Sequence, residues 1–239
     1  MMECIGKRHI NEQKKRKNLN KNHMKKVLVV SFFLFIIGTV QAQNIQFITN
    51  GKINIATFEI YKSLEHGAMY YFTDFKMSKN GYTEAYSEIS KYWNIGKVGA
   101  LTLQYNAGLN ETFHIFPVYL GGVSKSFTIG KTFNLEFDLM YRHQNFLYLG
   151  DKEKHDGYQL TTIFSESFGK FQFSGYCDYW NFNYFIFEPQ GWYKFSKRVY
   201  AGLEWRLSNY DDVLNYDMQG NFIGKYAKYL MFGFKWDLE

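Results

Sequence analysis

The sequence predicts an all-β fold, a transmembrane antiparallel up-and-down β-barrel of about 12 strands that follows a cleaved N-terminal signal peptide. From about residue 44 onward, apolar and polar residues alternate, as in 133–142, 200–207 and 229–238, and no stretch has helical periodicity. A two-residue period gives each strand one apolar, aromatic-rich face and one polar face. Each stretch is also long enough to cross a bilayer as a tilted strand, which takes roughly 9–11 residues.

Residues 1–42 have the features of an export leader. Met24, Lys25 and Lys26 supply a positive start, 27–38 is apolar or small, and Ala42 ends a small-residue cleavage site. The apolar stretch is too short for a membrane-spanning helix, which needs about 20 residues. We therefore expect Gln43 to begin the mature chain and 43–239 to form a single barrel domain. The 23 residues before Met24 are read as untranslated, with Met24 the true initiator, or as an extended basic segment, and we favour the first.

The charge of the mature chain excludes a nucleic-acid-binding protein. The leader holds nine of the 28 basic residues and two of the 22 acidic ones, which leaves 19 and 20. The formal charge of +6 therefore belongs to the leader, and no basic surface for nucleic acid remains. Cys4 is lost with the leader, and Cys177 alone cannot form an internal disulfide.

The alternation predicts twelve strands, separated by Gly-, Asn- and Lys-containing or longer polar segments. In order, they cover 44–49, 53–61, 67–77, 84–93, 99–107, 117–126, 133–143, 157–167, 171–181, 185–195, 199–208 and 226–237. The alternation is imperfect in 53–61, 84–93 and 185–195, so the register of these three strands stays open.

The connections between these strands alternate between short turns and long loops. The short ones are 63–67, 94–98, 128–132, 168–171 and 196–198, and four of them contain a Gly-Lys or Ser-Lys step. The long ones are 77–84, 108–117, 143–157 and 209–225. Outer-membrane barrels have short periplasmic turns and longer extracellular loops. An even strand number would place both termini on the periplasmic side.

A secreted soluble sandwich or lipocalin-like barrel would also alternate and carry a signal peptide. Soluble strands average about 5–6 residues, shorter than these. Aromatic residues make up 21% of the chain, which suits two interfacial girdles. We therefore favour the cell outer membrane, with its lipids and lipopolysaccharide and the barrel assembly machinery as partners. The chain ends in Leu238 and Glu239 rather than the aromatic residue common in such barrels, which questions the efficiency of assembly and not the class.

Three short motifs carry a family resemblance, which is clearest over residues 54–107. They are Thr57-Phe58-Glu59-Ile60-Tyr61, Phe72-Thr73-Asp74-Phe75 and Tyr86-Ser87-Glu88-Ile89. Their order and spacing resemble the nucleoside-specific channel-forming outer-membrane porin family (Tsx-like). The resemblance implies a monomeric twelve-stranded barrel whose narrow lumen passes nucleosides.

The polar faces of the strands would line the lumen. Reading off the alternation, they carry Glu59, Tyr70, Phe72, Asp74, Tyr86, Glu88, Tyr92, Glu136, Asp138, Arg142, Tyr176, Asp178, Trp180, Glu188, Trp192, Lys194, Tyr200, Glu204, Arg206, Tyr229, Lys235 and Asp237. A one-residue register error would instead place Tyr92 and Trp180 in the aromatic girdles.

Aromatic rings can stack on a planar base, and carboxylates can accept hydrogen bonds from ribose hydroxyls or base amino groups. The candidate substrate-binding residues are Phe72, Asp74, Tyr86, Glu88, Asp178, Trp180, Glu136 and Arg206. Alternatively, the acids pair with Arg and Lys across the lumen and close the barrel. The function classes are then a selective channel for small solutes, which the resemblance implies are nucleosides, or a closed structural or adhesion barrel.

A barrel lipid hydrolase is a weaker alternative, and the chain is expected not to be an enzyme. His143 would lie at the outer rim facing lipid, but Asn145 occupies the position where barrel phospholipases carry a serine. Asp211, Asp212, Asn215 and Asp217 offer oxygen ligands in the last long loop without the spacing of a calcium-binding loop. We predict no metal and no cofactor.

Overall fold

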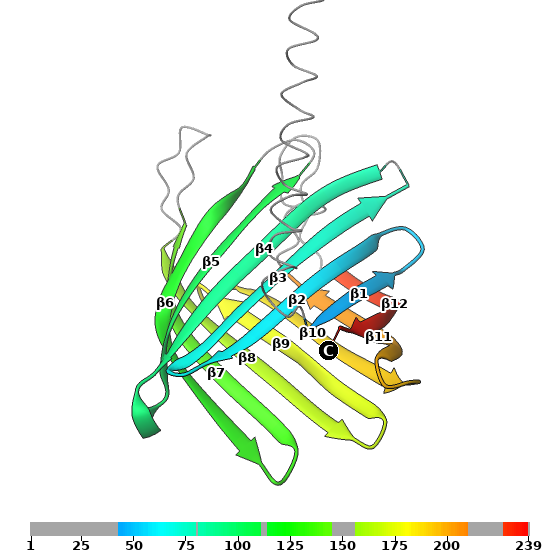
Figure 1. The fold of residues 1–239 in the computed structure, drawn as a ribbon. Coiled ribbons are helices and arrows are strands. Elements are labelled where there is room, and N and C mark those ends of the chain that lie inside the picture. Colours follow the sequence, from blue (N-terminus) through cyan, green and yellow to red (C-terminus); the bar gives the residue numbers. More distant parts are fainter. Residues whose placement is uncertain (1–42, 80, 111–113, 145–155, 210–226, 239) are drawn as a thin grey trace, which may run out of the picture. The chain divides into compact units, whose positions relative to one another are not determined.

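The computed structural model describes residues 43–79, 81–110, 114–144, 156–209 and 227–238, which form a closed antiparallel barrel (Figure 1). Each strand pairs with its neighbours in sequence, and β1 closes the barrel against β12. The strands are β1 Asn44–Thr49, β2 Asn54–Leu64, β3 Gly67–Ser78, β4 Gly81–Asn94, β5 Ala100–Asn110, β6 His114–Ile129, β7 Phe133–Gln144, β8 Gly157–Phe168, β9 Phe171–Trp180, β10 Tyr184–Lys194, β11 Val199–Ser208 and β12 Ala227–Asp237. A 3₁₀ turn, η1 Gly96–Val98, joins β4 to β5. In these ranges, no helix has the length and apolar character to cross a membrane.

The strands are strongly tilted, as the ribbon shows (Figure 1). Starting from a residue of β1, we can step from each strand to the paired residue on the next. After one circuit of the barrel, this walk reaches β1 at a position about 16 residues further along. For 12 strands, this stagger corresponds to a tilt of about 43° and a backbone radius of about 12 Å. Once side chains fill part of this radius, the interior is narrow.

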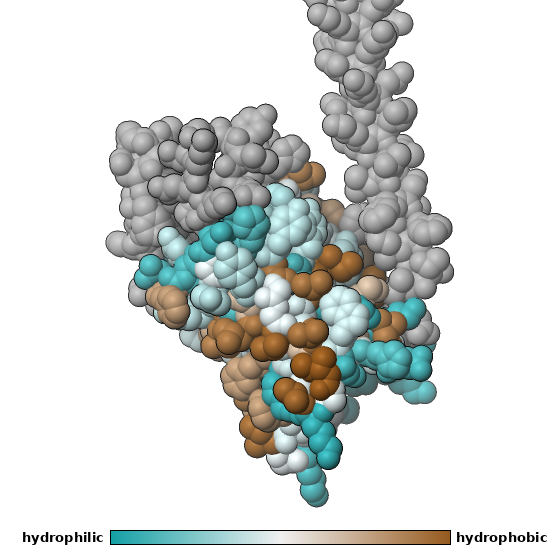
Figure 2. Space-filling model, turned by 90° about the vertical axis from the view of Figure 1, so that its left-hand side faces the viewer, coloured by the Kyte–Doolittle hydropathy of each residue, from teal (hydrophilic) through white to brown (hydrophobic). Residues whose placement is uncertain are grey.

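The barrel is apolar outside and polar inside, the reverse of a soluble protein. In β7, Leu139 is 54% exposed on the outer wall, whereas its inward neighbours Asp138 and Met140 are 1% and 0% exposed. Apolar side chains gather on the middle of the described outer surface, with hydrophilic ones below (Figure 2). In water, such a wall would be unfavourable, whereas hydrocarbon favours it. The surface pattern therefore argues against the soluble alternative.

All twelve expected strands are present, and the fold class is confirmed. Two of the four expected long loops were wrong, because neighbouring strands extend into them. Segment 77–84 is mostly strand, since Gly81, with φ of 111°, allows β4 to begin there. Segment 108–117 is also mostly strand. The register shifts between Asn106 and Gly108, so Pro117 lies in β6 beside an irregularity, where a residue without an N–H is tolerated.

The barrel has two distinct ends. Gln43 and Leu238 lie together at the first end, where the Leu238 N–H donates to the Gln43 carbonyl at 3.1 Å. The short turns after β2, β4, β6, β8 and β10 lie there too, and we call it the termini end. The opposite, loop end carries the connections after β7 and β11. Residues 1–42, most of these two connections, and the acidic segment with Asp211, Asp212, Asn215 and Asp217 lie outside the described residues.

Apolar side chains fill one sector of the interior. Trp192 and Tyr200, each 1% exposed, pack with Ile48, Ile55 and Met231 from β1, β2 and β12. A smaller cluster on β6 and β7 contains Val118, Leu120 and Met140. Polar side chains therefore line only part of the lumen wall.

Candidate functional site

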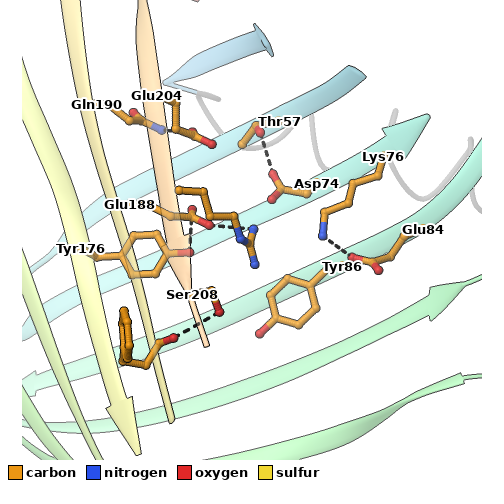
Figure 3. Close-up of polar contacts among 12 residues, drawn as sticks. Thr57, Asp74, Lys76, Glu84, Tyr86, Tyr176, Glu188, Gln190, Glu204 and Ser208 are labelled. Atoms are coloured by element: carbon orange, nitrogen blue, oxygen red, sulfur yellow. Dashed lines mark hydrogen bonds and ion pairs between the residues drawn. The ribbon is translucent and has the colours of Figure 1, made fainter. Parts of the chain in front are cut away.

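Five carboxylates from opposite walls converge in the middle of the lumen, and we call them the acidic ring. Asp74 on β3 and Glu88 on β4 face Asp178, Glu188 and Glu204 on β9, β10 and β11. Glu88 lies within electrostatic range of Asp178, Asp74 and Glu188, and Glu204 lies within range of Glu188 and Asp74. Side chains from β2–β4 and β9–β11 point into the same space (Figure 3). The local negative potential is therefore shared across the barrel.

Neutral groups hold most of these carboxylates in place. Glu88 accepts hydrogen bonds from the Tyr86 hydroxyl at 2.6 Å and from the amides of Gln104 and Asn106 at 2.9 and 3.0 Å. The Gln190 amide donates to Glu204 at 2.7 Å. Amide and hydroxyl donors orient a carboxylate without cancelling its charge.

Asp74 and Asp178 follow the same rule. The Thr57 hydroxyl donates to Asp74 at 2.6 Å (Figure 3), and the Thr161 hydroxyl donates to Asp178. Glu59, nearer the termini end, accepts from Asn44, Gln46 and Tyr70. Neutral support is thus a general feature of the lumen acids on β2, β3, β4, β9 and β11.

Ion pairs involve few of the lumen acids among the described residues. Arg206 Nη1 lies 2.7 Å from Glu188 Oε1, and the Tyr176 hydroxyl donates to the other Glu188 oxygen at 2.8 Å. Lys76 on β3 and Glu84 on β4 form a second pair at 2.6 Å (Figure 3). Within the described ranges, the pairing alternative therefore accounts for Glu188 but not for the other four acids of the ring.

Aromatic rings line the wall beside the acidic ring. The Tyr70 and Phe72 ring centroids are 5.9 Å apart, and those of Phe72 and Tyr86 are 6.1 Å apart. Because the Tyr86 hydroxyl also bonds Glu88, this short ladder places apolar faces directly against charged groups. Such a surface offers both stacking area and hydrogen-bond acceptors to a passing solute.

Of the eight residues expected to bind solute, six lie together. Phe72, Asp74, Tyr86, Glu88, Asp178 and Arg206 belong to the ring or to the aromatic wall beside it. Trp180 is inward-facing but lies at the loop end, where Arg142 packs over its ring at 5.7 Å. Glu136 lies near the termini end and accepts from Ser126.

Sequence reasoning placed Glu188 and Glu204 in the lumen but did not single them out as binding residues. Their inward positions on β10 and β11 were visible in the alternation. Their approach to Asp74 and Glu88 was not, because those residues come from strands on the opposite wall. The alternation left open whether Tyr92 faces the lumen or lies in an aromatic girdle. In the structure it points inward, and its hydroxyl donates to Asp138 on β7 at 3.1 Å.

The hydrolase alternative gains one contact but no nucleophile. His143 Nδ1 lies 2.6 Å from Asp156 Oδ1 on the outer wall. Within the described part of the chain, no serine or threonine hydroxyl hydrogen-bonds to His143, and Asn145 lies outside it. The same part contains no group of three His, Cys, Asp or Glu residues arranged to hold a metal ion.

This chain matches one protein family by sequence and solved porin structures by fold alone. A family model described as a domain of unknown function (DUF5020) matches residues 42–232. No curated protein matches. Among solved structures, the NanC porin is 9% identical with a TM-score of 0.54, covering 82% of this chain and 99% of its own. The KdgM porin is 10% identical with a TM-score of 0.49, covering 82% and 98%. The NanC likeness supports the barrel fold.

Proposed function

This chain belongs to the domain family of unknown function DUF5020, and from that premise and the inside-out barrel we propose that it is an outer-membrane channel for passive, selective diffusion of small solutes. The observation that carries the proposal is the acidic ring, in which four of the five carboxylates are oriented by neutral donors rather than by ion pairs. A barrel built only for stability would gain little from like charges brought together.

The ring favours solutes that are neutral or positively charged. Anions approaching Glu88 and Asp178 would meet a negative potential in a narrow passage, which raises their barrier. A nucleoside suits the site, because it is uncharged, has a planar base for Phe72 and Tyr86, and carries hydroxyl and amino donors for carboxylates. Passage requires several weak contacts rather than one tight site, and the ladder beside the ring provides them.

Planar-bilayer conductance of the refolded mature chain tests this proposal. We expect single-channel steps that millimolar adenosine or thymidine reduces and that an uncharged sugar at the same concentration does not. Blockade should weaken in Phe72→Ala and Asp178→Asn, while Glu166→Gln, which lies on the outer wall near the termini end, should behave as the unsubstituted chain. Conductance steps that nucleosides do not change would contradict the nucleoside assignment. A folded barrel that shows no conductance would contradict the channel proposal.

A closed structural or adhesion barrel is the second candidate, and specific contacts favour it. Tyr92 reaches from β4 to Asp138 on β7, and Lys235 reaches from β12 to Gln172 on β9 at 2.8 Å. Both cross intervening strands and narrow the interior. If these contacts close the lumen, liposomes containing the barrel should not swell in any small solute.

The cellular context of the proposal follows from the same pattern. We propose export through the leader, insertion by the barrel assembly machinery and residence as a monomer among outer-membrane lipids and lipopolysaccharide. The termini end would face the periplasm, since short turns characterise that side. Protease treatment of intact cells should then cleave only within the connections after β7 and β11.

A further inference from the structure

A lysine side chain occupies an aromatic enclosure inside the termini end of the barrel. Lys235 Nζ lies 4.6 Å from the Tyr200 ring centroid and 5.2 Å from the Trp192 ring centroid. It also donates to the Gln172 side-chain oxygen at 2.8 Å. The four residues come from β9, β10, β11 and β12, so the lysine reaches across two strands to meet Gln172.

The walls of this enclosure are fixed independently of the lysine. Trp192 and Tyr200 are each 1% exposed and pack on Ile48, Ile55 and Met231. The Trp192 indole N–H donates to Gln190 at 3.0 Å, which sets the orientation of its ring. Rings held this firmly would keep their places if the ammonium group were removed.

Two aromatic faces and a carbonyl oxygen form the chemistry that recognises an alkylammonium group. The aromatic faces attract the cation, and the amide oxygen accepts one of its N–H bonds. We propose that Trp192, Tyr200 and Gln172 form a binding site for the amino group of a small organic solute, which Lys235 of the same chain occupies when no such solute is present. The site holds primary alkylamines, because the observed occupant is one.

The acidic ring lies further along the same lumen toward the loop end and would concentrate cations near this site. A solute carrying an amine could then exchange with Lys235 as it passes. This role in passage rests on the proposed channel function, whereas binding of the amine does not. Lys235 would act as a tethered occupant that keeps the termini end narrow.

Chemical rescue tests the site without requiring conductance. In Lys235→Ala, refolded in detergent micelles, n-butylammonium chloride should raise the temperature at which the barrel loses its folded electrophoretic mobility, and the effect should saturate in the millimolar range. Sodium chloride and 1-butanol at the same concentrations should produce no saturable shift. The unsubstituted chain should respond at least tenfold more weakly, because Lys235 competes. Adding Trp192→Leu should abolish the rescue.

Lys91→Ala is the matched control, since Lys91 also lies over an indole ring, that of Trp93 at 5.6 Å, but away from the enclosure. An equal butylammonium shift in Lys91→Ala, or no saturable shift in Lys235→Ala, would overturn the site. If Lys235→Ala does not refold, Lys235→Gln serves in its place. If neither refolds alone, restored refolding yield in butylammonium supports the site and an unchanged yield overturns it. Conductance of the unsubstituted chain then judges the channel proposal separately.

Discussion

Neutralising Glu88 should weaken the preference of the channel for cations, and the structure allows the size of the effect to be worked out. The backbone radius is about 12 Å, and a glutamate reaches about 5 Å inward, so its charge lies about 7 Å from the axis. In water, a unit charge at that distance changes the electrostatic energy of a monovalent ion on the axis by about 0.6 kcal/mol. Screening in 0.1 M salt reduces this to about 0.3 kcal/mol.

A change of about 0.3 kcal/mol acts in opposite directions on cations and anions, so their permeability ratio should fall about threefold. Glu88→Gln preserves the shape of the side chain and can still meet Gln104, Asn106 and Tyr86. Asp178→Asn removes a second charge from the facing wall. In the variant with both substitutions, the cation-to-anion permeability ratio should therefore fall about sevenfold, if the two charges act independently.

Reversal potentials measured at about pH 9, where the carboxyl groups of the ring are ionised, across a bilayer with a tenfold gradient of potassium chloride give this ratio. Glu166→Gln is the matched control, because it removes the same charge from an exposed position that bonds Thr132. Its reversal potential should match that of the unsubstituted chain. Conducting Glu88→Gln and Asp178→Asn channels with unchanged reversal potentials would refute the reasoning, since the acidic ring would then not lie on the ion path.

Four further predictions concern the outer wall, two lumen contacts and the leader. Leu139→Arg places a charge on the outer wall near mid-height and should lower the free energy of unfolding in lipid vesicles by about 2–4 kcal/mol. Phe133→Arg, on the same outward face of β7 but at the termini end, should cost far less, and equal losses would contradict a bilayer around β7. Arg206→Ala should destabilise by about 3–5 kcal/mol because Glu188 stays buried without its ion partner, and Arg206→Met with Glu188→Met should recover most of the loss in urea titrations. Tyr92→Phe should cost about 1–2 kcal/mol by removing a donor to buried Asp138, unlike Tyr105→Phe on the outer wall. Mass spectrometry of the exported chain should find Gln43 at its N-terminus, and a retained leader would disprove cleavage.

The alternation in the sequence was enough to predict the barrel, its strands and the inward face of each strand. Where the two-residue period is regular and one face is apolar, the orientation of the strand is fixed, because a slip by one residue would turn every side chain to the opposite side of the barrel wall. This is why the alternation was enough to predict the inward positions of Asp138, Arg142 and Glu204, whereas the structure decided the register of 53–61 and 84–93, which carry Glu59 and Glu88. Loop lengths were less secure: polar residues in 77–84 and 108–117 fit a strand that projects beyond the bilayer as well as they fit a loop.

The composition of the acidic ring was decided by closure of the barrel. Asp74 and Glu188 are separated by more than a hundred residues, and only the pairing of β1 with β12 and the stagger of the strands bring them to one level. The choice between neutral and charged partners for each acid also depends on register across neighbouring strands, as Gln104 and Asn106 beside Glu88 illustrate. Periodicity along one strand determines which way a side chain points, whereas the side chain that meets it across the lumen depends on the whole circuit of hydrogen-bonded strands.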